Sequence, residues 1–323
     1  TANAAVKGYL TVAGNVQSAA GNTNYGYVIG GESPAGGASH TAINRIDYSN
    51  DTATATVKNY IPQIFRYASA GNMNYGYFGG GNSPKRSFVF RIDYANDTSG
   101  ISERGPLTST KYYAEGAGNK DYGYFAGGAT GVTPANPTTV DRVDYSSDTT
   151  TASPRGPLTG KMHSDGSTGN ASFGYFSPGP SSGVPKQAPD RVDYSNDTAT
   201  AVTRGNVLND ADYRMATSPR ENGLPTHRFT ISTPFAFGEN PTSPSPYGYF
   251  GGGNGNAGGS DALSSVERVD YSNDTATSSV RGSLSAAFKY GSGTGNAFYG
   301  YFHGGDPGSR STVDRIDYSN DII

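Results

Sequence analysis

The 323-residue sequence contains no cysteine and no tryptophan. Without cysteine there is no disulfide framework, which disfavours a small extracellular scaffold held by cross-links. No run of about 20 apolar residues occurs, so we expect no membrane insertion. The formal net charge of −3 provides no basic field, and this argues against a nucleic-acid partner.

Glycine and tyrosine are abundant instead, with 46 and 24 copies, and much of this excess lies in a repeated phrase. The phrase reads Tyr-Gly-Tyr-Phe-Gly-Gly in its commonest form, and its copies begin at Tyr25, Tyr75, Tyr122, Phe173, Tyr247 and Tyr299. A second phrase, Arg-(Ile/Val)-Asp-Tyr followed by a polar turn, begins at Arg45, Arg91, Arg142, Arg191, Arg268 and Arg315. A unit that repeats at a spacing of about 50 residues indicates a repeat architecture, built from one structural element per unit.

Each unit predicts four short strands. Residues 75–78 are aromatic and end in a run of glycines, and residues 89–94 alternate polar and apolar side chains with a period of two. The short polar residues 96–98 are typical of a turn. Residues 52–57 predict a fourth strand, and the small residues 114–118 predict the first strand of another unit.

Four-stranded units of about 40–50 residues, repeated four to eight times, are typical of propeller blades. The sequence therefore predicts an all-β fold, a six-bladed β-propeller that forms a single domain over residues 1–323. A linear β-solenoid is the alternative, but its rungs are shorter and its ends need caps. The expected blades lie near 11–58, 59–104, 105–155, 156–204, 205–281 and 282–323, the last completed by 1–10.

The two ends of the chain predict how the ring closes. The last unit stops near Asp321 without a fourth strand, and residues 4–10 match residues 55–61 of the first unit. We therefore expect the N-terminal strand to join the C-terminal blade, which removes an open sheet edge. The chain starts at Thr1 and not at Met, which predicts a processed or trimmed beginning.

These patterns resemble a known family. The Gly-Gly pair after an aromatic strand, the later Tyr beside an Asp, and the Asn-Asp-Thr turn resemble kelch repeats over nearly the whole chain. Kelch units usually carry a tryptophan in the fourth strand, whereas this chain has Val57, Val202 and Val280 near that place. The wording of the two phrases most resembles kelch-like repeat proteins of marine bacteriophages, which implies a virion-associated, extracellular protein.

The loops differ in how far they vary among the six units. The turn between the third and fourth strands is nearly constant, whereas the loop between the second and third strands differs in every unit. These variable loops are residues 32–42, 82–88, 129–139, 178–189, 254–265 and 306–312. In an antiparallel blade, the loop after the second strand and the turn after the third strand lie on opposite faces. One face is therefore expected to be constant, and the face with the variable loops is suited to recognition.

Residues 205–246 contain an insertion of about 25 residues. We expect it to follow a fourth strand and to project from the variable face. It combines cationic and aromatic side chains that suit an acidic or sugar ligand, and the candidate ligand-binding residues are Arg214, Arg220, His227, Arg228, Phe229 and Phe235. A proline-rich flap that packs over the ring is the alternative interpretation.

No catalytic residue, metal site or cofactor is predicted. The arginine and aspartate of the third strand, Arg91 and Asp93 in the second unit, recur in every unit, at a spacing suited to charge ladders with a neighbouring strand or blade. This indicates a scaffold role, because an active site is normally singular. The four histidines, at positions 40, 163, 227 and 303, fall in different units. A galactose-oxidase-like copper site needs a cysteine-modified tyrosine, and this chain has no cysteine.

The sequence therefore favours a non-enzymatic recognition or adhesion module. The resemblance implies a tail-fibre or capsid-decorating protein that binds a host-surface glycan or protein receptor. A structural protein that assembles with copies of itself or docks on other virion proteins is the alternative. A glycan-cleaving enzyme is the second alternative.

Overall fold

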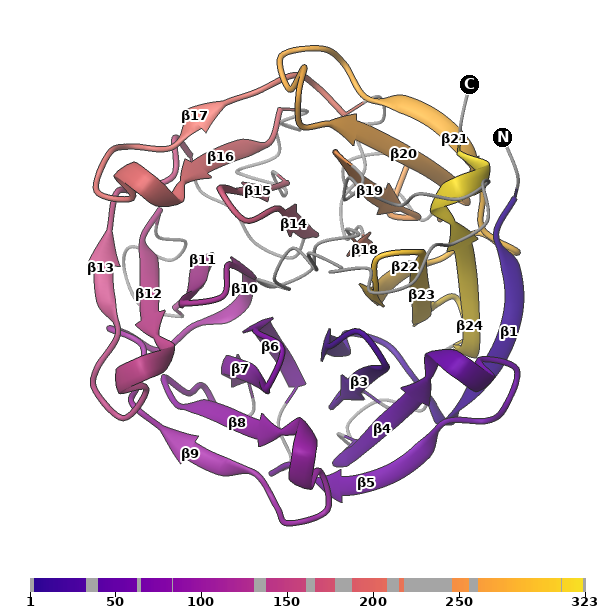
Figure 1. The fold of residues 1–323 in the computed structure, drawn as a ribbon, viewed down its shortest axis with the longest axis horizontal. Helices are drawn as coiled ribbons and strands as arrows, with labels where there is room; N and C mark the ends of the chain where they lie inside the picture. The colour runs from indigo at the N-terminus through magenta and orange to yellow at the C-terminus, as the bar shows by residue number, and fades with distance from the viewer. Residues whose placement is uncertain are drawn as a thin grey trace, which may run out of the picture.

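The strands pair into six separate four-stranded antiparallel sheets arranged around one axis (Figure 1). This computed structural model describes residues 3–32, 40–62, 65–82, 84–130, 138–160, 166–177, 188–207, 215–217, 246–255, 261–308 and 310–321. The predicted all-β, six-bladed propeller is therefore confirmed. None of the helices in these ranges has the length and apolar character that crossing a membrane would require.

The first three blades follow the chain, each with its first strand innermost and its fourth at the rim. Blade 1 contains β2 (Ser18–Gly21), β3 (Tyr25–Ile29), β4 (Ala42–Asp47) and β5 (Thr56–Tyr60). Blade 2 contains β6 (Phe65–Gly71), β7 (Tyr75–Asn82), β8 (Val89–Asp93) and β9 (Ser102–Arg104). Blade 3 contains β10 (Tyr112–Gly118), β11 (Tyr122–Ala129), β12 (Val140–Asp144) and β13 (Ser153–Arg155).

The other three blades complete the ring. Blade 4 contains β14 (Ser167–Gly169), β15 (Phe173–Phe176), β16 (Asp190–Asp193) and β17 (Val202–Thr203). Blade 5 contains β18 (Met215–Thr217), β19 (Tyr247–Gly251), β20 (Ser265–Asp270) and β21 (Ser279–Ser283). Blade 6 contains β22 (Lys289–Gly295), β23 (Tyr299–Asp306) and β24 (Arg310–Asp317), with β1 (Ala5–Gly14) as its outer strand.

The N-terminal strand closes the ring as expected. β1 pairs antiparallel with β24, with Ala5 opposite Arg315, and the two chain ends lie close together in Figure 1. The Ala4 amide donates a hydrogen bond to the Ser283 carbonyl of blade 5, which also ties the start of the chain to the neighbouring blade. The strand runs to Gly14, four residues beyond the expected 1–10, so more backbone holds the closure than the repeat alignment indicated.

The aspartate of the third strand forms a local cap, whereas the arginine pairs with a carboxylate of the neighbouring blade, one of the two partners expected. The Asp93 carboxylate accepts a hydrogen bond from the Ala95 amide and starts the short 3-10 helix η2 (Tyr94–Asn96). The same cap opens η1 (Tyr48–Asn50), η3 (Tyr145–Ser147), η4 (Tyr194–Asn196) and η6 (Tyr318–Asn320). Because this turn takes up several residues, β5 begins at Thr56, and the fourth strand expected at 52–57 was placed too early.

Stacked tyrosines join neighbouring blades. Tyr77 of β7 is fully buried, and its ring lies 4.6 Å from the ring of Tyr145 in blade 3, nearly parallel to it. Equivalent stacks at 4.7–4.9 Å join Tyr27 to Tyr94, Tyr124 to Tyr194, Tyr175 to Tyr271, Tyr249 to Tyr318 and Tyr301 to Tyr48. A stacked aromatic pair contributes about 0.5–1.5 kcal/mol beyond its buried area.

The glycine between the two tyrosines of the phrase makes room for these stacks. A Cβ atom on Gly76 would lie 2.7 Å from the Tyr94 hydroxyl of the same blade, and one on Gly123 would lie 2.7 Å from the Tyr145 hydroxyl. Any side chain there would push the stacked ring out of place. The Tyr-Gly-Tyr order of the phrase therefore follows from packing between blades.

A carboxylate clamp holds each blade to the next. The Tyr77 hydroxyl and Arg91 Nη1 of blade 2 donate to the same atom, Asp148 Oδ2 of blade 3, at 2.8 and 2.7 Å. Burial, followed by the hydrogen bond to Asp148, raises the pKa of Tyr77, so the hydroxyl stays a donor. Matching clamps join Tyr27 and Arg45 to Asp97, Tyr124 and Arg142 to Asp197, Tyr175 and Arg191 to Asp274, Tyr249 and Arg268 to Asp321, and Tyr301 and Arg315 to Asp51.

The clamp predicts a large effect of neutralising one carboxylate. We expect Asp148→Asn to lower the free energy of unfolding by about 3 kcal/mol, because Arg91 and Arg104 would keep their charge without a partner. Urea denaturation followed by circular dichroism measures this. Asp121→Asn is the control, since Asp121 pairs with Lys120 at the exposed surface, and it should change stability by less than about 0.5 kcal/mol. Equal effects of the two substitutions would contradict the clamp.

Candidate recognition face

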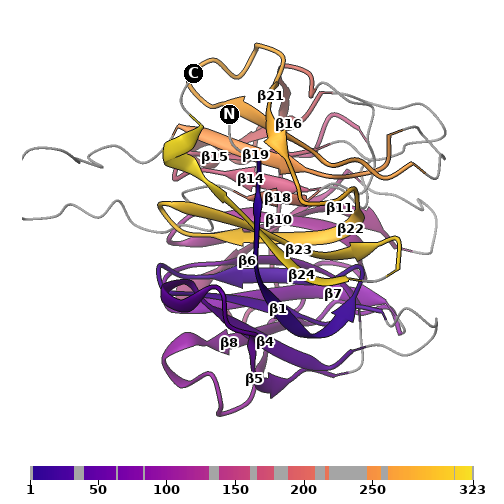
Figure 2. The same ribbon diagram turned by 90° about the vertical axis from the view of Figure 1, so that its right-hand side faces the viewer.

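Figure 2 shows the ring edge-on, with η6 next to the C-terminus at one face. The two faces differ in their turns and loops. The uniform face carries the first-to-second and third-to-fourth turns. In its turns the Asn72 side chain accepts hydrogen bonds from the amides of Asn74 and Tyr75, and Asn22, Asn119, Asn170 and Asn296 repeat the arrangement. The sequence analysis did not single out these asparagines, although each stands three residues before the aromatic phrase.

The strands that flank the long insertion place both of its ends on the uniform face. β18 runs antiparallel to β19, with Thr217 opposite Tyr249, so the chain leaves β18 and re-enters at Tyr247 on the uniform face. The insertion thus lies between the first and second strands of blade 5, and the expectation that it follows a fourth strand was wrong. The candidate residues Arg214, Arg220, His227, Arg228, Phe229 and Phe235 lie outside the described residues.

The variable face carries the second-to-third loops and the connections between blades. In blade 6, β23 ends at Asp306 and β24 begins at Arg310, so the expected loop 306–312 is mostly strand. In blade 2 the loop is short, with Lys85 exposed in a turn. The loops therefore differ in length as well as in sequence.

Four residues on this face have a backbone that L-amino acids rarely adopt. Val16, Arg66, Tyr113 and Tyr290 have φ angles of 48°, 65°, 58° and 61°. Each stands five residues before the glycine that ends the first strand of its blade, so they occupy one repeat position in blades 1, 2, 3 and 6. A left-handed conformation costs about 1–2 kcal/mol for each such residue.

Two of these side chains meet across a blade boundary. The Arg66 guanidinium of blade 2 lies 4.1 Å above the ring of Tyr113 in blade 3, and its Nη2 lies 3.7 Å from Glu32 Oε2 of blade 1. The rings of Tyr112 and Tyr113 are 5.5 Å apart. We call Glu32, Arg66, Tyr112 and Tyr113 the axial arc, and all four are half-buried.

Blade 6 continues the same row of residues. The Val16 amide donates a 2.7 Å hydrogen bond to the Tyr290 carbonyl, which places the left-handed residues of blades 1 and 6 side by side. Lys289 Nζ lies 5.6 Å from the Tyr290 ring. Cation–aromatic contacts therefore occur at this row in blades 2, 3 and 6, whereas blade 1 contributes Val16 and the carboxylate of Glu32.

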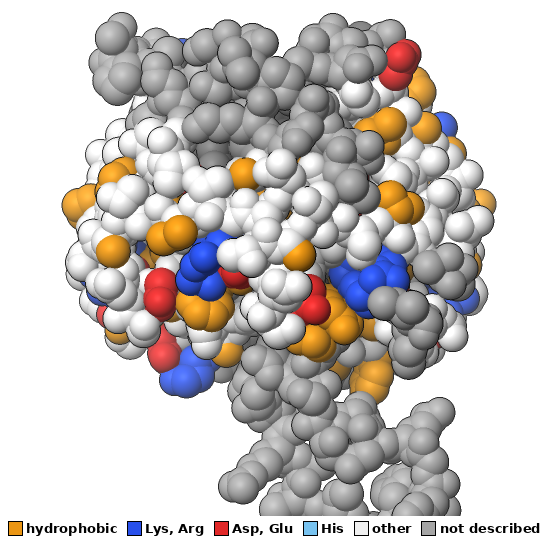
Figure 3. Space-filling model, turned by 90° about the horizontal axis from the view of Figure 1, so that it is seen from above, with side chains coloured by type: hydrophobic (Ala, Val, Ile, Leu, Met, Phe, Trp, Pro, Cys, Tyr) orange, Lys and Arg blue, Asp and Glu red, His pale blue; other side chains and the backbone are white. Residues whose placement is uncertain are grey.

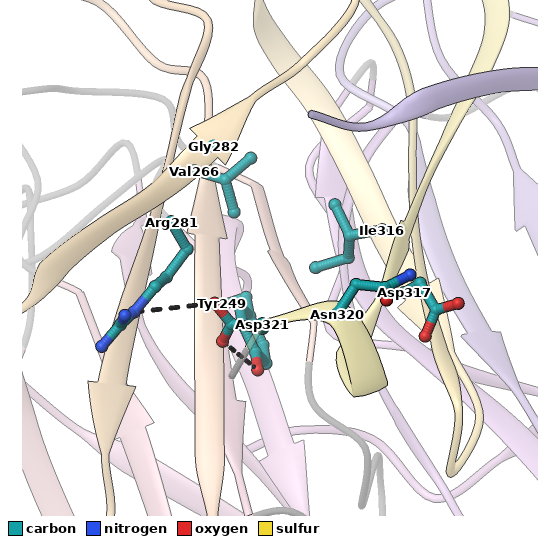
Figure 4. Close-up of a pocket in the computed structure, with 8 residues that line it drawn as sticks. All are labelled: Tyr249, Val266, Arg281, Gly282, Ile316, Asp317, Asn320 and Asp321. Carbon is teal, nitrogen blue, oxygen red and sulfur yellow. Dashed lines mark hydrogen bonds and ion pairs between the residues drawn. The ribbon is translucent and has the colours of Figure 1, made fainter. Parts of the chain in front are cut away.

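A cavity of about 20 Å³ lies elsewhere, between blades 5 and 6 (Figure 4). It is lined by Tyr249, Val266, Arg281, Gly282, Ile316, Asp317, Asn320 and Asp321, and Asp321 forms the clamp with Tyr249 there. Arg281 Nε lies 3.6 Å from Asp321 Oδ1. This volume suits about one water molecule and not an organic ligand.

Blade 3 contains a buried ion pair. Lys111 and Asp141 are completely buried and paired at 3.1 Å, and burial lowers the pKa of Lys111. No group of three or more His, Cys, Asp or Glu side chains in the described ranges could hold a metal ion. His303 of β23 is also fully buried, whereas positions 163 and 227 lie outside these ranges.

The rim of the ring is mixed in character. Figure 3 shows hydrophobic side chains scattered among polar ones over the described surface of one side. The large hydrophobic residues that stay exposed include Tyr9 and Tyr60, which lie on the outer strands β1 and β5 of adjacent blades. Scattered exposed apolar residues are ordinary on a protein surface and do not mark an interface by themselves.

Comparison with known proteins supports the fold. No protein-family model matches the sequence, and no curated protein sequence matches it. Among solved structures, one described as "Structure of YjhT" matches with a TM-score of 0.69 and 12% sequence identity, over 95% of this chain and 95% of that chain. At this identity the likeness shows the architecture alone.

His303 predicts a loss of stability in acid. Burial lowers the pKa of His303 from 6.5 to about 3, so below pH 6.5 the unfolded chain binds a proton that the folded chain does not. This contribution to the free energy of unfolding is complete above pH 6.5 and falls by up to about 1.4 kcal/mol per pH unit as the pH drops towards 3.

The variant that tests this is His303→Ile, since isoleucine occupies the equivalent position 29 of blade 1. Urea titrations at several pH values between 7 and 4 should show a shallower decline for the variant than for the wild type. Parallel declines in the two proteins would show that His303 does not set the acid sensitivity.

Proposed function

We propose that the chain is a non-enzymatic recognition module that binds a component of a host-cell surface through its variable face. The observation that carries this proposal is the contrast between the faces of one rigid ring. The uniform face repeats the same caps in blade after blade. The loops of the variable face differ between blades, and side chains are kept there on a strained backbone. A rigid scaffold with variable loops is the usual arrangement of a binding protein.

The resemblance of the repeat to kelch-like proteins of marine bacteriophages supports a virion-associated, extracellular setting for this module. In that setting the uniform face, on which the insertion begins and ends, would be available for attachment to other virion proteins. The host-surface receptor would be a glycan or a protein contacted from the opposite face. A fold shared with a solved six-bladed propeller is compatible with such a binding role.

The absence of cysteine allows the two faces to be blocked separately. Lys85→Cys places a single thiol on the variable face, and Lys120→Cys places one on the uniform face, and both lysines are exposed. Each variant is coupled to a polyethylene glycol maleimide, and its binding to a panel of marine bacteria is measured by flow cytometry.

We expect the polymer at position 85 to reduce cell binding at least tenfold and the polymer at position 120 to change it less than twofold. The unlabelled variants control for the substitutions themselves. Binding that is blocked equally at both positions, or only at position 120, would contradict the assignment of the variable face.

A further inference from the structure

We propose that the axial arc is a saccharide-binding subsite that takes one neutral sugar unit. Arg66 would donate hydrogen bonds to sugar hydroxyl groups, and Glu32 would accept them. The rings of Tyr112 and Tyr113 would contact the apolar flank of the sugar. This inference rests on the proposed recognition function and names the ligand class and residues of the same face.

The backbone strain at this repeat position indicates that its side chains have a role of their own. The chain is rich in glycine and places it at positive φ on the facing second strands, at Gly81 opposite Arg66, Gly128 opposite Tyr113 and Gly305 opposite Tyr290. Glycine adopts this conformation without steric cost. A side chain is nevertheless kept on the first strand, so the side chain itself serves a purpose that the backbone does not require. Strained residues of this kind gather at binding sites.

The residues at the left-handed position differ from blade to blade, unlike the residues of the clamp. The clamp that joins the blades repeats the same Tyr, Arg and Asp six times, as a structural requirement does. The left-handed position holds an aliphatic, a basic and two aromatic residues. Variation of this kind on one repeat position is typical of a surface adapted to a ligand and not of a common structural contact.

The chemistry of the arc favours a neutral sugar over a charged ligand. Arg66 Nη2 lies 3.7 Å from Glu32 Oε2, so this pair has no net charge and offers donors and an acceptor side by side. The exposed Lys85 borders the arc, with its Nζ 5.6 Å from the Tyr112 ring. That combination matches neighbouring hydroxyl groups, each of which donates and accepts. A free anion would meet the Glu32 carboxylate, and a free cation would meet Arg66. Tyrosine rings supply an apolar face with a polar edge, which suits a sugar ring.

The contacts also fix the arc in place before any ligand binds. The guanidinium of Arg66 is held over the Tyr113 ring at 4.1 Å, and Tyr113 in turn lies against Tyr112. Ordering side chains in the free protein lowers the entropy cost of binding. The strained backbone of Arg66 and Tyr113 therefore presents a pre-formed set of groups across blades 1, 2 and 3.

The test uses the full chain and a panel of free sugars. Glucose, galactose, mannose and N-acetylglucosamine, with their disaccharides, form the neutral arm, and glucuronic acid and glucosamine form the charged arms. Saturation-transfer NMR identifies binders, and titration gives their dissociation constants. We expect at least one neutral sugar to bind more tightly than the charged sugars.

Three variants locate the site. Arg66→Gly and Tyr113→Gly should weaken binding at least tenfold while the melting temperature stays within about 3 °C of the wild type, because glycine relieves the left-handed strain. Glu32→Gln keeps the shape of the side chain and should weaken binding several-fold. Tyr60→Ser removes an exposed tyrosine from the rim and should leave both quantities unchanged.

The following results would overturn the proposal of a sugar subsite. Binding of no neutral sugar, tighter binding of a charged sugar, or unaltered binding by the glycine variants would show that the arc is not this subsite. Glycine variants that lose binding only together with a large drop in melting temperature, with Glu32→Gln binding normally, would make the arc structural. If sugars fail to bind but the polymer at position 85 still blocks cell binding, the recognition function stands and only the sugar subsite fails.

Discussion

The carboxylate clamp between blades is the interaction on which the rest of the ring depends. In each junction one aspartate oxygen accepts hydrogen bonds from a buried tyrosine and from an arginine of the preceding blade, as Asp148 does from Tyr77 and Arg91. The next blade also places a tyrosine on that buried ring, and a glycine leaves the room for it. Because β1 completes blade 6, the series of clamps has no open end. A ring held in this way can vary its loops without loosening its blades.

At one position next to the clamp, a buried carboxylate and its hydrogen-bond donor change together between blades 3 and 2. The residue before the clamp arginine is the buried Asp141 in blade 3, and Thr108 donates its hydroxyl to it at 2.6 Å. In blade 2 the equivalent positions hold Phe90 and Pro62, so the carboxylate and its donor are both gone. A buried carboxylate without a donor would be costly, which explains why the two change together. The repeat is thus strict at the clamp and adjustable where a second residue compensates.

The two faces differ in how their backbone is held. The uniform face uses asparagine and aspartate caps whose side chains are occupied by their own backbone, so its turns are fixed by local hydrogen bonds. On the variable face the inner strands keep Arg66 and Tyr113 in a strained conformation. The proposed binding function lies where the local rules of the repeat are broken, as expected of a site that selection has not optimised for stability.

The sequence by itself determined the six blades, the order of their strands and the closure by the first strand, because strand period, glycine placement and turn chemistry are local and repeat six times. It also showed which loops vary. The tertiary structure decided which partner Arg91 takes, because the sequence left a neighbouring strand and a neighbouring blade open and Arg91 pairs with Asp148 of the next blade. It also located the insertion after β18, since a three-residue strand leaves no pattern to recognise. The axial arc was equally hidden, because Glu32, Arg66 and Tyr113 come from three blades, and a left-handed φ depends on how the surrounding backbone is held and not on the residue type.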